Sequence, residues 1–244
     1  MKNHNAKTIC NGELVIVKIT EDLYDQAIEL YQNYFMKYEN VSTATNLLAS
    51  QASIDEMETL IREIMKDGVS FAAKHVITNE LIAMCVNKIN NPSAGCTLDS
   101  VIQSFKTPSM QCVGAYLERM ESTFDLFKQW HVDCVMEIVF LSTRTDFGQK
   151  GIAISMSEHA IDYARNMMND TLAPTELLPD HVKNMKPQAV CAVFTSKYSQ
   201  RVGEKLGFET LCKISNKEFV FEGKTFAEKI DPVHEFSTFA AIRL

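Results

Sequence analysis

The segment from Val132 to Met168 constrains the fold of this chain more than any other. Residues 135–143 combine β-branched and aromatic side chains in a short apolar run, which predicts a buried strand. A loop follows, and after Gly151 the apolar residues recur at a spacing that places one stripe on a helix. The first N–H groups of such a helix have no partner within it, and the helix dipole favours an anion there. The segment therefore predicts a phosphate or pyrophosphate site, although one glycine between a strand and a helix is more often plain turn chemistry.

A second strand and helix follow further along the chain. Residues 188–194 predict a strand, which ends in two hydroxyl residues. A short helix comes next, and the triplet Leu-Gly-Phe closes it with Gly207 placed as a left-handed C-cap. This second unit strengthens the interpretation of the first as a binding site.

Together the two units resemble the Gcn5-related N-acetyltransferase superfamily. The acyl-CoA loop of that family begins with Arg or Gln, continues after two residues with Gly, and ends after one more with Gly or Ala. The same register in this chain gives Gly148, Gln149, Lys150, Gly151, Ile152 and Ala153. The later helix of the family ends in Leu-Gly-Phe after a Glu-Lys pair, as residues 204–208 do. The Tyr-Ser-Gln-Arg sequence at 198–201 and an early Tyr34-Phe35 followed by Glu39 are most similar to the insect-type arylalkylamine N-acetyltransferases.

The order of the predicted elements indicates a single α/β domain over residues 1–244. Residues 1–12 are expected to be flexible, and residues 90–108 and 169–187 to form long loops, the second of them a surface loop or a lid. Helices are predicted over 22–38, 53–68 and 113–127, and the second of these begins with a capping box at Ser53. Further strands are predicted at 13–19, 69–76, 81–89, 210–214, 218–225 and 237–244. The resemblance implies the acyl-CoA N-acyltransferase fold, a central splayed mixed sheet with helices on both faces.

Charge and cysteine usage exclude several classes of partner. The formal net charge of −7 argues against a nucleic-acid binder or an anionic-membrane binder, which would need a basic face. Seven cysteines without a C-x-x-C motif indicate reduced thiols. With no signal-peptide core and no run of 18 apolar residues, we expect a cytoplasmic protein, monomeric or weakly dimeric.

The resemblance implies acetyl-CoA as the cosubstrate and indicates the residues that would hold it. Main-chain groups of Leu141, Ser142 and Thr143 would face the pantetheine arm and the thioester carbonyl. The N–H groups from Gln149 to Ala153 would hold the pyrophosphate, and Ser199 would also contact the cosubstrate. Amides fixed before charge develops stabilise an oxyanion.

Two residues of the loop need separate comment, because Gly148 departs from the family pattern and Lys150 has two possible roles. Gly148 stands where the family has Arg or Gln, so a side-chain contact to phosphate is missing there. Lys150 would supply that charge instead, or it is a solvated loop lysine.

Acetylation of an amine needs an uncharged nitrogen, so a base must take the ammonium proton. Glu39 stands where the insect-type enzymes place a proposed base, although Asn40 follows it where those enzymes have a proline. The alternative is that Glu39 is an exposed acid near a helix end. The resemblance also implies an amine pocket at Tyr34, Phe35 and Tyr38.

The leaving thiolate needs a proton or a hydrogen bond. The tyrosine that many enzymes of the superfamily use would stand at Gly203, so a tyrosine acid in that position is excluded. Ser199 and Thr195 match hydroxyls of the insect-type enzymes, and Tyr198 is another nearby donor. Ser199 can equally cap the helix that begins near it, and both roles can hold at once.

Other reaction types lack their motifs. There is no G-x-S-x-G elbow, and the six histidines have no metal-ligand spacing, so we expect no metal. The resulting hypothesis is acetyl transfer from acetyl-CoA to a primary arylalkylamine by direct attack in a ternary complex. One alternative is a polyamine or other aliphatic amine acetyltransferase, which would line its pocket with acids instead of aromatics. The other is a CoA-binding regulatory protein that has lost transfer, for which Gly148 and Gly203 are the motivating departures.

Overall fold

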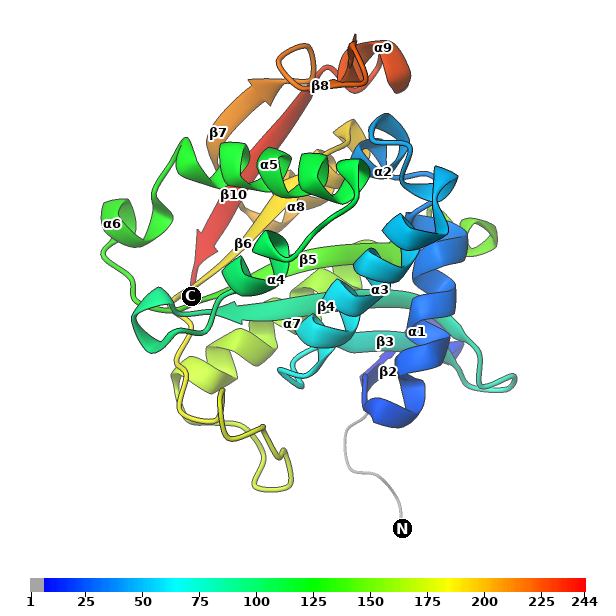
Figure 1. The fold of residues 1–244 in the computed structure, drawn as a ribbon. Coiled ribbons are helices and arrows are strands. Elements are labelled where there is room, and N and C mark those ends of the chain that lie inside the picture. Colours follow the sequence, from blue (N-terminus) through cyan, green and yellow to red (C-terminus); the bar gives the residue numbers. More distant parts are fainter. Residues whose placement is uncertain (1–6) are drawn as a thin grey trace.

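A computed structural model describes residues 7–244 as an eight-stranded mixed sheet with helices on both of its faces (Figure 1). In spatial order the strands are β1 (Thr8–Ile9), β2 (Leu14–Lys18), β3 (Phe71–His75), β4 (Leu81–Asn90), β5 (Val135–Thr143), β6 (Ala189–Phe194), β10 (Phe236–Arg243) and β7 (Glu209–Ser215). Within this sheet the β5–β6 pair is parallel and the other pairs are antiparallel. The predicted α/β class and mixed sheet are confirmed.

Helices cover the sheet from two sides. They are α1 (Tyr24–Leu30), α2 (Asn40–Ala44), α3 (Gln51–Met65), α4 (Asp99–Gln103), α5 (Pro108–Ser122), α6 (Leu126–Trp130), α7 (Ile152–Met168), α8 (Lys197–Leu206) and α9 (Phe226–Lys229). One apolar core joins α1, α3 and α5 to one face of the sheet. The other core joins α7 to the opposite face through Met156, Ala160 and Ala164, whose spacing of four residues forms a buried stripe.

Strands β5 and β6 separate along part of their length, as the resemblance implied. They pair through only three residue pairs, the last of which joins Glu137 to Cys191. Beyond that pair β5 still follows β4 as far as Thr143, and β6 still follows β10. A β-bulge in β5 at Val139 increases the local twist just after the separation begins. The edge of β5 that faces β6 therefore has free backbone groups beyond Glu137.

The helix predicted over 22–38 is divided. After a 3-10 turn at Glu21–Leu23, α1 runs to Leu30 and continues as a π-helix, Tyr31–Phe35, in which the N–H of Met36 donates to the carbonyl of Tyr31 at 2.9 Å. A π-turn inserts one residue into the helical period, so the residues after it are rotated relative to an α-helix.

Three local predictions are corrected by the structure. The capping box at Ser53 is wrong, because α3 begins at Gln51 and Ser53 is fully buried inside its first turn. The helix predicted through 113–127 breaks into α5 and α6, since Asp125 caps a new helix by accepting the N–H of Lys128 at 3.0 Å. Residues 218–225 do not join the main sheet but form the separate hairpin of β8 (Val220–Phe221) and β9 (Lys224–Thr225).

The segments expected to be irregular differ from one another. Residues 1–6 lie outside the described residues, whereas residues 8–12 form β1 and a 3-10 turn. Residues 90–108 contain α4 and a 3-10 turn at Pro92–Ala94. Residues 169–187 have no helix or strand; Glu176 in this segment pairs with Lys18 of β2 at 2.7 Å, and Met185 contacts Asn91 after β4.

Candidate active site

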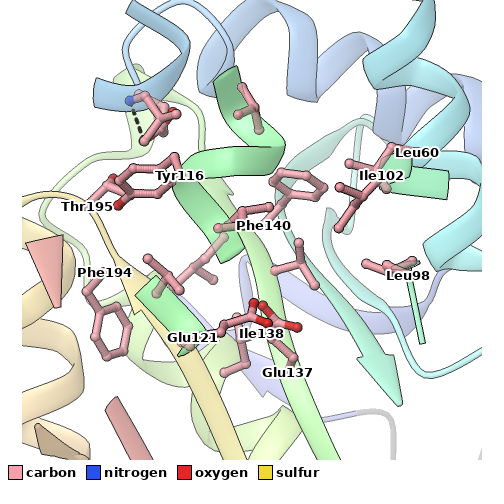
Figure 2. A pocket seen from close by; sticks show the side chains of 18 of the residues that line it. Leu60, Leu98, Ile102, Tyr116, Glu121, Glu137, Ile138, Phe140, Phe194 and Thr195 are labelled. Atoms are coloured by element: carbon pink, nitrogen blue, oxygen red, sulfur yellow. Dashed lines mark hydrogen bonds between the residues drawn. The ribbon is translucent and has the colours of Figure 1, made fainter. Parts of the chain in front are cut away.

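The separation of β5 and β6 opens a cavity of about 280 Å³ between the sheet and helices α3 and α5 (Figure 2). Its wall is mainly apolar, and three rings pack together on one side of it. Tyr31 stacks on Phe35 with ring centroids 5.1 Å apart, and Phe140 meets both rings edge-on at 5.0 and 5.4 Å. No residue between 169 and 187 lines the cavity, so the lid interpretation of that loop gains no support.

Glu39 lies on the cavity wall as the N-cap of α2. Its Oε1 accepts the N–H of Val41 at 2.9 Å, and its Oε2 accepts the N–H of Ser42 at 2.7 Å and the Ser42 hydroxyl at 3.0 Å. Asn40 donates its Nδ2–H to the carbonyl of Thr195 at 2.7 Å, which fastens the start of α2 to the end of β6. The residue that replaces the expected proline therefore helps to hold Glu39 in place.

Two tyrosine hydroxyls near Glu39 were not predicted as functional from the sequence. Tyr31 and Tyr116 both line the cavity, both are buried, and among residues 7–244 neither hydroxyl has a hydrogen-bond partner. Burial first, and the charge of Glu39 after it, raise the pKa of both phenols, so they remain neutral donors. The sequence feature that could have identified Tyr31 is its phenol hydroxyl within an apolar helical stripe, because a buried tyrosine hydroxyl usually needs a hydrogen-bond partner.

Two of the predicted hydroxyl residues also line the cavity, Thr195 directly after β6 and Ser199 in the first turn of α8. Ser196 is the N-cap of α8, where its Oγ accepts the N–H of Ser199 at 3.0 Å. Ser199 completes a capping box by accepting the N–H of Ser196 at 3.2 Å. Ser199 therefore caps the helix and faces the cavity, as Thr195 does, so its two predicted roles are compatible.

Gly203 is explained by its contact with Phe194. A Cβ atom at Gly203 would lie 2.4 Å from Cε2 of Phe194, and the Phe194 ring itself lines the cavity. The space in which the usual tyrosine of the superfamily would begin is therefore filled by the Phe194 ring.

Of the three residues predicted for the amine pocket, Phe35 lines the cavity. The ring of Tyr34 lies 6.0 Å from the guanidinium of Arg144, and Tyr38 is 64% exposed. Because the π-turn rotates the helix, Tyr31 and Phe35 face the sheet in place of Tyr34.

The predicted acyl-CoA loop forms a concave run of backbone N–H groups before α7. Gln149 and Gly151 have positive φ angles of 61° and 76°, and alternating conformations of this kind turn successive N–H groups toward one point. Among residues 7–244, the N–H groups from Gln149 to Ala153 have no hydrogen-bond acceptor. These free donors at the start of a 17-residue helix fit a pyrophosphate.

Side chains and strand residues around this loop complete the predicted cosubstrate site. Lys150 lies 3.6 Å from a carboxylate oxygen of Glu13 and 4.5 Å from the centroid of the Phe147 ring, so both interpretations of it stay open. Gly148 has an extended backbone, and a Cβ there would meet the carbonyl of Thr145 at 3.1 Å. The part of β5 that no longer pairs with β6 includes Leu141, Ser142 and Thr143, and Leu141 lines the cavity.

Two acidic residues on the cavity wall were missed by the sequence analysis. Glu137, from β5, is 8% exposed and accepts the Nδ2–H of Asn90 at 2.8 Å. Glu121, from α5, is an exposed residue that lines both the cavity and an adjoining hollow of about 600 Å³. Desolvation of its carboxyl first, and then the charges of Glu137 and Asp99, raise the pKa of Glu121 to about 8. The one sequence feature that could have identified Glu137 as a candidate site residue is its position as a single acid inside an apolar strand.

Two further searches of the described residues bear on other functions. Among residues 7–244, no group of three or more His, Cys, Asp or Glu side chains is placed to hold a metal ion. Within the same residues, none of the helices has the length and apolar composition that crossing a membrane requires.

No protein-family model matches the chain, and no curated protein matches its sequence. Among solved structures, arylalkylamine N-acetyltransferase 2 from Aedes aegypti matches with a TM-score of 0.75 and 22% identity, over 94% of this chain and 98% of that one. Mosquito arylalkylamine N-acetyltransferase-like 5b gives a TM-score of 0.77 and 15% identity over 95% and 100%. The Drosophila melanogaster polyamine N-acetyltransferase gives 0.75 and 13% over 95% and 100%. These likenesses confirm the predicted fold.

Proposed function

From the Gcn5-related N-acetyltransferase fold of this chain, we propose that it transfers the acetyl group of acetyl-CoA to a primary amine. One observation carries the proposal. The splay of β5 and β6 brings a fixed carboxylate, Glu39, into the same cavity as the free edge of β5, and the loop that follows β5 carries the free N–H groups that precede α7. A fold alone does not fix a reaction, whereas this arrangement supplies a base, an acyl-donor site and an anion site together.

The residues of the site have complementary tasks in this proposal. The N–H groups from Gln149 to Ala153 hold the pyrophosphate, and the main chain of Leu141, Ser142 and Thr143 binds the pantetheine amides. The N–H groups of the free β5 edge also face the carbonyl oxygen on which negative charge develops.

Proton transfer accompanies the exchange of bonds. Glu39 accepts the ammonium proton, so the neutral nitrogen forms a bond to the acetyl carbon as the carbon–sulfur bond breaks. The bonded nitrogen then loses a second proton as the amide forms, and the hydroxyl of Ser199 or Thr195 relays it by giving its own proton to the leaving thiolate and taking up the one from nitrogen. No covalent bond to the protein is required, so the transfer takes place in a ternary complex.

The cavity wall supports an acceptor with an apolar body. Tyr31, Phe35 and Phe140 present ring faces and edges next to Glu39, which suits an arylalkylamine. The second candidate, a polyamine or other aliphatic amine, is favoured by a different observation, because Glu121 and Glu137 line the same cavity.

The test is release of free thiol from acetyl-CoA with a panel of amines. The panel contains tryptamine, phenylethylamine, spermidine and unbranched alkylamines. Turnover on any primary amine supports acetyl transfer, and the ratio of kcat/KM between aryl and alkyl members decides between the two acceptor classes. Saturable CoA binding without turnover on any amine would contradict the proposal and favour a CoA-binding regulatory protein.

A further inference from the structure

We infer that Glu121 and Glu137 form a subsite for a second cationic group of the acceptor, so that this chain prefers amines with two positive charges. The acceptor amine then lies at Glu39, and its distal ammonium or guanidinium lies between the two carboxylates. This inference rests on the proposed function, because it names the substrate class of the same cavity.

The subsite lies at the opposite end of the cavity from Glu39. Glu137 belongs to the last residue pair before β5 and β6 separate, and its partner there is Cys191. The strand β6 then runs on to Thr195, whose carbonyl holds Asn40 beside Glu39. A strand rises about 3.3 Å per residue, so the four steps from Cys191 to Thr195 span roughly 13 Å. Between the two ends the wall is apolar and aromatic, which suits an alkyl or aryl spacer.

Glu137 is a buried carboxylate without a cation. It is 8% exposed, and its only hydrogen-bond partner among residues 7–244 is Asn90, on Oε2. Its Oε1 has no donor, and within the same residues no Lys or Arg comes within 4.0 Å of it. An unpaired buried carboxylate is costly, which leaves a place for a cation from a ligand.

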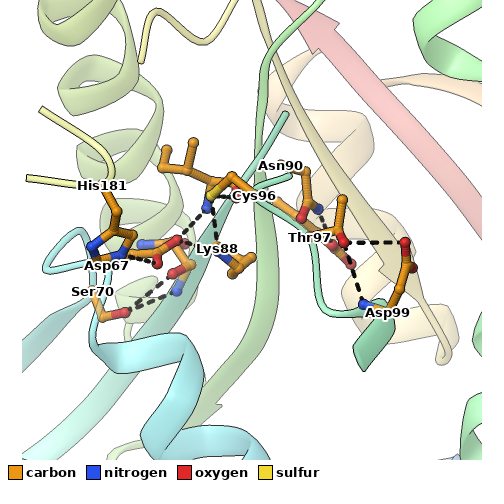
Figure 3. Close-up of polar contacts among 11 residues, drawn as sticks. Asp67, Ser70, Lys88, Asn90, Cys96, Thr97, Asp99 and His181 are labelled. Carbon is orange, nitrogen blue, oxygen red and sulfur yellow. Dashed lines mark hydrogen bonds and ion pairs between the residues drawn. The ribbon is translucent and has the colours of Figure 1, made fainter. Parts of the chain in front are cut away.

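The nearest basic group is already engaged elsewhere. Lys88 lies directly opposite Glu137 on β4, but its Nζ pairs with Oδ2 of Asp67 at 2.8 Å and contacts Cys96 (Figure 3). Both Lys88 and Asp67 are buried, so that ion pair is poorly placed to exchange partners. Lys88 therefore lowers the energy of a charge on Glu137 without neutralising it.

Glu121 brings a second carboxylate to the same place. Figure 2 shows its side chain next to that of Glu137, and each lines both the cavity and the adjoining hollow. Neither the cavity nor the hollow has a Lys, Arg or His in its lining, whereas Asp99 adds a third acid to both. The far end of the cavity is therefore negative and free of competing cations.

The ionisation of the pair is consistent with a cation site. Burial raises the pKa of Glu137, and burial with Glu137 and Asp99 raises that of Glu121, so the unliganded pair retains a proton near neutral pH. The charged and titratable groups that face the pair from neighbouring elements are Asp99 on α4, Lys88 on β4 and Cys191 on β6. A bound cation favours the ionised form, so binding should release a proton.

The test compares each diamine with the monoamine of the same length. The pairs are 1,6-diaminohexane with hexylamine, 1,8-diaminooctane with octylamine, and 4-(aminomethyl)phenethylamine with phenethylamine. Kinetic constants for acetyl transfer are measured on the full chain and on the Glu137→Gln and Glu121→Gln variants. The matched control is Glu209→Gln, because Glu209 is exposed on β7 and makes no ion pair among residues 7–244.

We expect the unmodified chain to prefer the diamine of at least one pair by about tenfold or more in kcat/KM, the difference that a partly desolvated ion pair supplies. Glu137→Gln should reduce that preference to less than about threefold through KM of the diamine, and Glu209→Gln should retain it. Equal kcat/KM for diamines and monoamines would overturn the inference while leaving the acetyltransferase intact.

Calorimetric titration with 1,8-diaminooctane separates the inference from the proposed function. Binding that weakens in Glu137→Gln supports the subsite even if no amine is acetylated, in which case the transferase proposal alone fails. The number of protons released on binding is obtained by repeating the titration in buffers of different ionisation enthalpy. That number should be smaller for Glu121→Gln than for the unmodified chain. Absence of diamine binding to a folded chain that binds CoA would overturn the inference.

Discussion

Replacing Glu39 with Gln separates the two tasks of this side chain, capping α2 and accepting a proton. The carboxylate accepts three hydrogen bonds, two of them from the backbone N–H groups of Val41 and Ser42 at 2.9 and 2.7 Å. An amide has a single acceptor oxygen, so one of these N–H groups would face an NH₂ group. Loss of a helix cap costs about 0.5–2 kcal/mol. Since a domain of this size loses about 2–4 °C per kcal/mol, the melting temperature should fall by a few degrees.

The kinetic effect should be larger than the structural one. A general base contributes about 10²–10⁴-fold to the rate. At about 1.4 kcal/mol for each factor of ten, that range corresponds to roughly 3–5 kcal/mol in kcat/KM, more than the loss of the cap. The assay is thiol release at saturating acetyl-CoA from pH 5 to 9, with thermal unfolding measured on the same samples. Glu39→Gln should also remove the acidic limb of the pH profile.

Ser42→Ala is the matched control for this substitution. It removes the 3.0 Å hydrogen bond from the hydroxyl to Oε2 but keeps the carboxylate and both backbone contacts. Its stability should fall by about 0.5–1.5 kcal/mol. Its kcat/KM should change by less than about tenfold, because the base remains. The assignment of Glu39 would be refuted if Glu39→Gln kept its acidic limb, or if Ser42→Ala lost as much activity.

Three further predictions concern Gly203, Gly151 and Glu121. Gly203→Ala brings a methyl group to 2.4 Å from the Phe194 ring. This clash should lower the free energy of unfolding by about 1–3 kcal/mol, more than the roughly 1 kcal/mol that alanine adds through helix propensity. An unchanged midpoint of urea unfolding would contradict this prediction. In Gly151→Ala the new methyl group meets no atom within 4 Å, but alanine must adopt a φ of 76°. The backbone strain of about 1–2 kcal/mol should distort the loop and weaken CoA binding. An unaltered dissociation constant for CoA would argue against the N–H site. Because the pKa of Glu121 is raised to about 8 in the folded chain, the folded state holds a proton that the unfolded state releases, so stability should fall as pH rises from about 5 to 8. Glu121→Gln should flatten that slope, and parallel curves would contradict the raised pKa.

The parts of the fold that could be predicted are those that a local pattern determines. The short β-branched run of β5 and the left-handed Gly207, with φ of 81°, follow from side-chain type and from the absence of a Cβ atom. Ser53 shows the limit of such patterns. It satisfies the sequence rule for a capping residue, yet packing extends α3 back to Gln51 and buries its hydroxyl without a partner among residues 7–244.

The amine pocket depended on a detail that periodicity cannot detect. A regular helix places Tyr34 on the same stripe as Leu30 and Tyr31, and the sequence analysis used that period. The π-turn at Tyr31–Phe35 adds one residue to the turn, so Phe35 takes the place of Tyr34 beside Tyr31 and Phe140. Resemblance pointed to the segment from Tyr34 to Tyr38, but which of its side chains lie on the cavity had to come from the structure.

The same break in the sheet determines both ends of the acceptor site. Because β5 and β6 pair only as far as Glu137 and Cys191, a side chain at position 137 lies at the end of the cavity that adjoins the second hollow, while the free backbone of β5 begins immediately beyond it. The bulge at Val139 then shifts the alternation of the strand, so that Phe140 faces the same core as Val135 despite the odd number of steps between them. The presence of Glu137 and of the Phe140 ring on the wall of one cavity is thus a consequence of strand register. Lengthening the β5–β6 pairing would shorten the cavity from the Glu137 end, so the distance between Glu39 and Glu137 should set the preferred length of the diamine.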